Sequence, residues 1–201
     1  MLSQPYSTSE NAPGSLRSRV ETRRLAAARR AGQALGALPI AAALLIALGD
    51  ALGILISNTD SAAPAGIYRV VGRHVKRGDL VAACLPIPVA RQGLARGYLR
   101  PSGCPGGAEP VDKQIGAVPG DVVDIEPRWV AVNGVRFANS ATASHDSAGR
   151  PLAHIAWGKH RVAAHEVWLF GFNDGRSWDS RYFGPIPAAN LRGRLEPVLT
   201  W

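Results

Sequence analysis

The sequence predicts a mainly β domain preceded by one N-terminal transmembrane helix. The helix is predicted by a nearly unbroken apolar run over residues 31–56, since about 20 apolar residues are enough to cross a bilayer. The β domain is predicted by the rest of the chain, in which short runs rich in β-branched residues are bounded by turn residues. A long amphipathic helix is not visible in this part of the chain.

The basic character of the chain is concentrated before the apolar run. The formal charge is +8, and 46% of the 201 residues are hydrophobic, which allows one packed domain of ordinary size beside the helix. Many of the arginines form a group near the N-terminus: Arg17, Arg19, Arg23, Arg24, Arg29 and Arg30. Basic residues that flank one end of an apolar helix indicate membrane topology, and no nucleic-acid-binding motif accompanies them. We therefore expect no nucleic-acid partner.

This charge pattern divides the chain into three parts. Residues 1–30 form a basic cytoplasmic tail, residues 31–56 a transmembrane anchor in contact with the lipid bilayer, and residues 57–201 an extracytoplasmic domain. Because the basic flank stays in the cytoplasm, we expect a single-pass protein of the inner (cytoplasmic) membrane with its domain in the periplasm or extracytoplasmic space. A cleaved signal peptide has the same order of basic and apolar regions, but the length of the run favours a retained anchor.

Five strands stand out in the domain. They are expected at residues 67–71, 80–83, 122–125, 129–132 and 165–170. The dipeptide Asn133-Gly134 between Val132 and Val135 predicts a hairpin turn, because both of its residues tolerate positive φ.

The two cysteines, Cys84 and Cys104, lie in a stretch rich in proline and glycine and do not form a CxxC pair. In an extracytoplasmic domain they are expected to form a disulfide, which would close a loop of about 20 residues and stabilise the fold by about 3 kcal/mol. Two buried free thiols are the alternative. The five histidines show no metal-ligand spacing, so we expect neither a metal nor another cofactor.

Four segments carry residues that could perform chemistry. In chain order they are residues 61–64, the turn at Gly78-Asp79, residues 113–121 and residues 177–184. The third segment is unusual because Lys113 opens an apolar strand, and a lysine that faces a core is costly to desolvate. In this order the four segments resemble the conserved boxes of the type I signal peptidases. Within that family the chain is most similar to the TraF-type maturation peptidases of plasmid conjugation, through the Cys-Pro-Gly-Gly at Cys104 and the closing Pro-Val-Leu-Thr-Trp.

The resemblance implies a signal-peptidase-like β domain that acts as a serine endopeptidase with a Ser–Lys dyad. Ser61 would be the nucleophile and Lys113 the general base, since a lysine accepts a proton only when neutral and burial favours its neutral form. Thr59 would assist in stabilising the oxyanion. Ser177 would hydrogen-bond to Lys113 and orient it. Asp179 and Arg181 would pair to shape the site, although a purely structural ion pair is the alternative for them.

One position departs from the TraF-type pattern. There the nucleophile usually stands two residues before the proline, and in this chain that position is Ala62, counted back from Pro64. Ser61 instead has the Ser-x-x-Pro spacing of the general signal peptidases, with Thr59 two residues before it. Either Ser61 is the working nucleophile, or the chain is an inactive scaffold that binds transfer or pilus proteins.

The resemblance also implies the partners. They would be exported precursor proteins such as pilin subunits, each lying extended along the edge of a strand, with small side chains next to the cleaved bond.

Overall fold

The computed structural model describes residues 39, 42–49, 52, 54–58 and 63–201. The chain forms two compact units, the second of which runs from Gly49 to Trp201. Residues 42–49 are helical, and among the described residues no helix is long and apolar enough to span a membrane. The predicted tail lies wholly outside the described residues, and so does half of the predicted anchor. Leu55 and Ile56, the last described residues of the predicted anchor, form the start of a strand.

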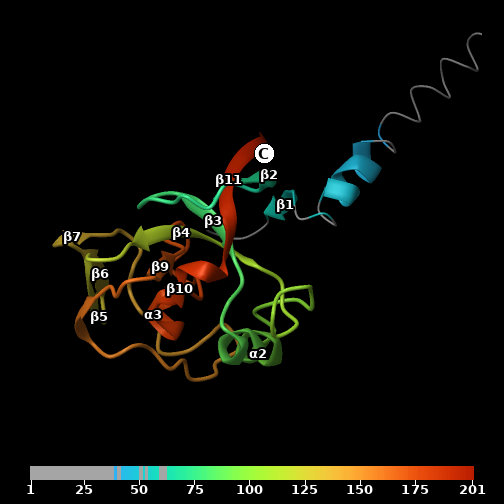
Figure 1. Ribbon diagram of the computed structural model, residues 1–201. Coiled ribbons are helices and arrows are strands. Elements are labelled where there is room, and N and C mark those ends of the chain that lie inside the picture. The colour runs from blue at the N-terminus through green and yellow to red at the C-terminus, as the bar shows by residue number, and fades with distance from the viewer. Residues whose placement is uncertain (1–38, 40–41, 50–51, 53, 59–62) are drawn as a thin grey trace, which may run out of the picture. The chain divides into compact units, whose positions relative to one another are not determined.

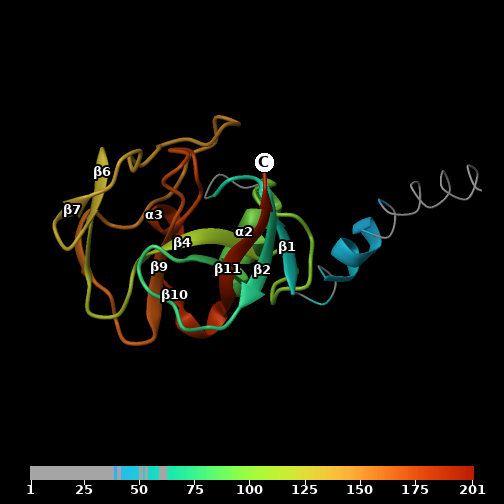
Figure 2. The ribbon, with the colours of Figure 1, turned by 90° about the horizontal axis from the view of Figure 1, so that it is seen from above.

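A seven-stranded antiparallel sheet is the main element of the second unit. In spatial order its strands are β1 (Leu55–Asn58), β2 (Gly66–Val71), β11 (Leu191–Thr200), β3 (Leu80–Ala83), β4 (Val111–Ala117), β9 (Glu166–Phe170) and β10 (Ile186–Pro187). The last strand of the chain, β11, lies between two early strands and runs beside β2 to the C-terminus (Figures 1 and 2). The two ends of the domain sequence therefore meet in one sheet.

The second sheet is antiparallel and has four strands. Its spatial order is β7 (Val135–Arg136), β6 (Trp129–Val132), β5 (Val122–Glu126) and β8 (Gly158–Arg161). The predicted hairpin is confirmed: Val132 pairs with Val135, and Asn133 and Gly134 have φ values of 51° and 82°. The strands expected at residues 80–83 and 129–132 are β3 and β6, and the other three expected strands each differ by one residue at one end.

The helices of the second unit are short, and the sequence did not predict them. They are α2 (Ile87–Arg96), α3 (Ser180–Phe183) and the 3₁₀ helix η1 (Ala188–Asn190). A proline stands in the first turn of α2, and Gly97 with a φ of 71° ends it. Gly93 within α2 costs about 1 kcal/mol of helix propensity relative to alanine. The local pattern is therefore weak, and α2 depends on the burial of Ala90 and Gly93 against the rest of the fold.

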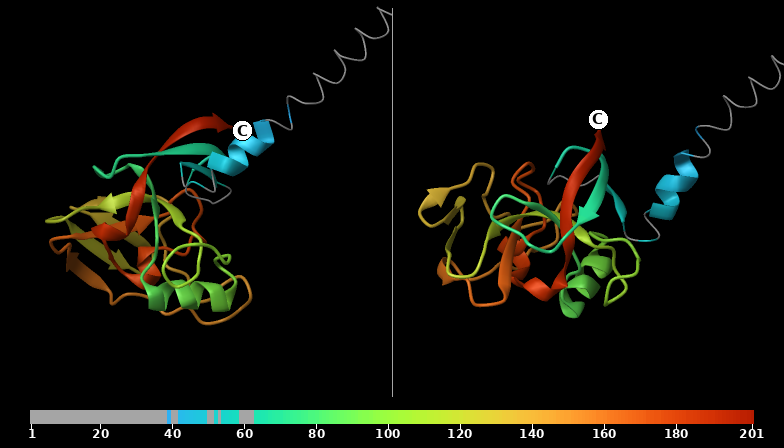
Figure 3. Two further views of the ribbon diagram at one scale, coloured as in Figure 1. Left: turned by 45° about the vertical axis from the view of Figure 1, so that its right-hand side comes forward. Right: turned by 45° about the horizontal axis from the view of Figure 1, so that its top comes forward.

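The pair of strands β4 and β9 lies between two hydrophobic cores. On one side, Leu169 of β9 belongs to a core that includes Ala90 of α2 and Val81 of β3. On the other side, Trp168 and Phe170 of β9 pack with side chains of β5 and β6. Accordingly, α2 and the four-stranded sheet contact different parts of the seven-stranded sheet (Figure 3). A side chain in the middle of β4 is thus shielded from solvent.

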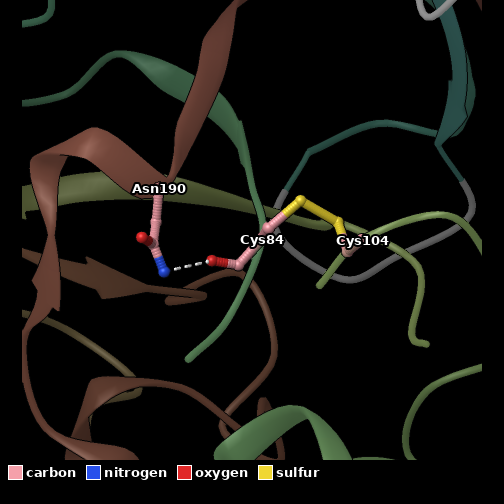
Figure 4. Close-up of a disulfide and its surroundings, with 3 residues drawn as sticks. All are labelled: Cys84, Cys104 and Asn190. Carbon is pink, nitrogen blue, oxygen red and sulfur yellow. Dashed lines mark hydrogen bonds between the residues drawn. A yellow bond between two sulfur atoms is a disulfide. The ribbon is translucent and has the colours of Figure 1, made fainter. Parts of the chain in front are cut away.

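Cys84 and Cys104 form a disulfide, as predicted (Figure 4). Cys84 directly follows β3, and two hydrogen bonds to Asn190 hold its backbone. The Cys84 N–H donates to the Asn190 carbonyl at 3.0 Å, and Asn190 Nδ2 donates to the Cys84 carbonyl at 2.9 Å. The disulfide therefore ties the segment that contains α2 to the end of β3.

Candidate active site

Lys113 lies in β4 and its side chain is buried. Only 3% of the residue is exposed, and it is directly paired with Val81 of β3. The expectation of a lysine that faces the core is therefore confirmed. Since β4 begins at Val111, Lys113 is inside the strand and does not open it.

Gly171 creates the space next to this lysine. Strand β9 ends at Phe170, which pairs with Gln114, so Gly171 follows at the level of Lys113. A Cβ atom on Gly171 would overlap the hydroxyl of Ser177 and would lie 3.5 Å from Lys113 Cδ. The missing side chain thus leaves room for the Ser177 hydroxyl against the stem of the lysine. Sequence reasoning did not assign a role to Gly171, because its importance depends on which side chain faces it.

Ser177 is 4% exposed, and its backbone N–H donates to the Asp174 carbonyl at 3.0 Å. Among the described residues, its Oγ atom has no hydrogen-bond partner. The expected hydrogen bond between Ser177 and Lys113 is therefore absent from this structure. Catalytic hydrogen bonds often tighten only when substrate binds, so the orienting role of Ser177 stays a prediction.

Asp179 and Arg181 form an ion pair behind the site. Both side chains are fully buried, and two hydrogen bonds of 2.8 Å join the guanidinium to the carboxylate. Burial acts to lower the pKa of Arg181, but the hydrogen bond and charge of Asp179 outweigh it and raise this pKa above its ordinary value. The pair also holds the backbone, because Arg181 donates to the Ser177 carbonyl at 2.9 Å and Asp179 accepts from the Gly171 N–H at 3.0 Å.

A cavity of about 410 Å³ opens beside Ser177. Tyr98, Asp146, Trp178 and Tyr182 are among the residues that line it. The Tyr98 hydroxyl donates to Asp146 at 2.5 Å, and Arg150 donates to the same carboxylate at 2.7 Å. The hydrogen bond from Tyr98, followed by those from Arg150, holds the pKa of Asp146 well below its usual range, although desolvation opposes this. These contacts join the segment after α2 to the loop that follows β7.

The candidate nucleophile lies outside the described residues, together with Thr59 and Ala62. By sequence these residues belong to the connection between β1 and β2. The ends of this connection are held by the pairing of Asn58 with Gly66, and the Tyr68 hydroxyl donates to the Pro64 carbonyl at 2.8 Å. The structure therefore brings together Lys113, Ser177, Asp179 and Arg181, and the place of Ser61 stays a prediction.

The chain is similar in sequence to proteins of plasmid and conjugal transfer. The chain is 41% identical over 147 residues to a probable conjugal transfer protein TraF of Sinorhizobium fredii, which covers 72% of this chain and 76% of the relative. It is 34% identical over 163 residues to a plasmid transfer protein TraF of Escherichia coli, which covers 81% of this chain and 91% of the relative.

A solved structure that resembles the chain is the crystal structure of a signal peptidase I from Enterococcus faecalis. The TM-score is 0.37 and the sequence identity 22%, with coverage of 63% of this chain and 100% of the other. The family described as "Signal peptidase, peptidase S26" matches residues 28–201 of this chain. The chain therefore belongs to the peptidase S26 family of signal peptidases.

Proposed function

We propose that this protein is a membrane-anchored serine endopeptidase that uses a Ser61–Lys113 dyad to cleave exported precursor proteins. The observation that carries the proposal is the buried Lys113, which lies against Gly171 and Ser177 in a chain of the signal peptidase family. A lysine that served only solubility would be exposed, because burial of its ammonium group is costly.

The reaction follows from the roles of these groups. The neutral amine of Lys113 removes the hydroxyl proton of Ser61, and the serine oxygen attacks the carbonyl carbon of the scissile bond. The backbone N–H of Ser61 and the hydroxyl of Thr59 stabilise the negative oxygen of the tetrahedral intermediate. Lys113 then donates the proton to the leaving amine, which gives an acyl-enzyme. A water molecule then gives a proton to Lys113 as it attacks the ester carbonyl, and Lys113 passes this proton to the departing Ser61 oxygen, which releases the carboxylic acid product and restores both groups.

The proposed substrates are proteins of conjugative transfer, with pilin subunits as the first candidates. This part of the proposal is supported by the relatives, which are named as plasmid or conjugal transfer proteins. A location outside the cytoplasm is supported by the Cys84–Cys104 disulfide, because disulfides persist mainly in oxidising compartments.

A second candidate function is an inactive scaffold that binds the same precursor proteins. The observation that favours it is Ala62, which occupies the position where TraF-type enzymes usually have their serine. An alanine has no group that can attack a carbonyl.

Cleavage of a pilin precursor from the same transfer locus separates the two functions. We expect the purified full-length protein to cleave it and the variants Ser61→Ala and Lys113→Ala each to lose at least about 10³-fold in rate. The matched controls are Ser102→Ala and Lys159→Ala, because both residues are exposed. If the unaltered protein is inactive and Ala62→Ser creates activity, the dyad at Ser61 is wrong and the scaffold function is correct.

A further inference from the structure

Trp178 directly follows Ser177 and connects it to α2. Its indole packs on Gly93 of α2, where an added Cβ would lie 3.0 Å from Trp178 Cζ3. The ring also contacts two other aromatic rings, with centroid distances of 5.1 Å to Tyr98 and 5.2 Å to Phe183. Trp178 thus fills the space between the Ser177 segment and the helix.

The helix itself is fastened at both ends. At its N-terminal end the loop of Cys104 packs over it, since a Cβ on Gly106 would lie 3.1 Å from Ala90 Cβ. The disulfide fixes this loop to the end of β3, the strand that pairs with Lys113. At its C-terminal end, Arg96 donates to the Pro151 carbonyl at 2.9 Å and accepts from Arg150 at 2.8 Å. A helix of only ten residues is therefore held in place by contacts from outside itself.

The Ser177 hydroxyl has little else to keep it in place. Arg181 holds the Ser177 carbonyl, but among the described residues no hydrogen bond holds the hydroxyl. Its position depends on packing, with Gly171 on one side and the indole of the next residue anchoring the backbone on the other.

We propose that Trp178 is a positioning residue: braced by α2 and by the Cys84–Cys104 disulfide, it holds the Ser177 hydroxyl against Lys113. The inference rests on the proposed function, because the position of Ser177 affects a reaction only if Lys113 is its base. It also makes full activity dependent on formation of the disulfide, so that the protein reaches its active geometry only in an oxidising compartment.

Kinetics of the full-length protein test the positioning role of Trp178. We expect Trp178→Ala to lower kcat by about 10- to 100-fold with KM changed less than about twofold, and to shift the acid limb of the pH–rate profile. Trp178→Phe should keep most of kcat, since its phenyl ring can still pack on Gly93. The matched control is Trp157→Ala, which removes an indole that is 43% exposed. If Trp178→Ala lowers only the unfolding temperature and the folded protein keeps its kcat and pH profile, the proposal is wrong.

The disulfide gives the second arm of the test. The double variant Cys84→Ser, Cys104→Ser should also have a lower kcat than the unaltered protein. Adding Trp178→Ala to this double variant should lower kcat by a smaller factor than Trp178→Ala does in the unaltered protein. Fully additive effects on kcat would show that the disulfide does not act through Trp178 and would overturn that part of the proposal.

Amide hydrogen exchange tests the positioning role of Trp178 separately from the proposed function, because the measurement does not require an active enzyme. We expect Trp178→Ala and the double serine variant to lose exchange protection at the Ser177 N–H, which is bonded to Asp174 in the structure. Unchanged protection of the Ser177 N–H in Trp178→Ala would overturn the positioning role of Trp178, even if the protein is an active peptidase. If Trp178→Ala loses this protection but the unaltered protein cleaves no precursor, Trp178 positions the Ser177 segment and the proposed function is wrong.

Discussion

The guanidinium of Arg181 meets the carboxylate of Asp179 in a two-point ion pair from which solvent is fully excluded. The same two side chains hold the Ser177 carbonyl and the Gly171 N–H. One ion pair therefore holds the backbone at Ser177 and at Gly171, the glycine that both Ser177 and Lys113 pack against. We expect its contribution to be structural, acting on the site through these two backbone groups.

Removal of the negative partner should be strongly destabilising. Asp179→Asn keeps the shape of the side chain but leaves the Arg181 charge buried without compensation, so we expect a loss of about 3–5 kcal/mol in the free energy of unfolding. Urea unfolding measures this loss. The control is Asp124→Asn, on a half-buried strand position, which should change stability by less than about 1 kcal/mol. Equal effects of the two substitutions would contradict the structural role of the pair.

Gly171→Ala should impair the reaction more than the fold. The added methyl group would take the space of the Ser177 hydroxyl and displace it from Lys113, so we expect kcat to fall on the order of 100-fold. Gly175→Ala is the matched control in the same segment, because its nearest new contact is an ordinary 3.5 Å to the Asn139 carbonyl. Steady-state cleavage measurements give kcat for both variants. A Gly171→Ala variant with full activity would show that the close packing of Ser177 against Gly171 is not needed for the reaction.

Loss of the disulfide should lower stability as well as activity. The two cysteines are 20 residues apart, and for a loop of that length the entropy model predicts a loss of about 3 kcal/mol. Urea unfolding of the Cys84→Ser, Cys104→Ser variant should show this loss, and the unaltered protein with dithiothreitol should show the same shift in midpoint. A reductant effect that persists in the variant would have to come from another source.

Acidification should weaken the contact between Tyr98 and Asp146. The pKa of Asp146 is lower in the folded protein than in the unfolded chain, first because of the hydrogen bond from Tyr98. The ionised carboxylate therefore stabilises the fold at pH values above its unfolded pKa of about 3.9, and this contribution is lost as the pH falls further. Thermal unfolding midpoints measured from pH 6 to pH 2 should fall less steeply below about pH 4 in Asp146→Asn than in the unaltered protein. Parallel curves would contradict this assignment.

Features that depend on local chemistry could be predicted from the sequence. Strands β3 and β6 follow from their apolar, β-branched runs, and the hairpin follows from the tolerance of Asn133 and Gly134 for positive φ. The disulfide was predictable because the chain contains only two cysteines in a segment expected outside the cytoplasm. The order of the motifs was also visible, and it led to the peptidase family that the comparison confirms.

Features that depend on distant partners could be seen only in the folded chain. Strand β11 contains a glycine and a proline and forms because β2 and β3 offer it two edges. Helix α2 has a weak pattern of its own and needs the core and the disulfide. Likewise, Gly171 matters only because Ser177, six positions later in the chain, folds back into the space that a side chain would occupy. Local propensity acts between neighbours in sequence, whereas the room around an atom is set by residues that only folding brings together.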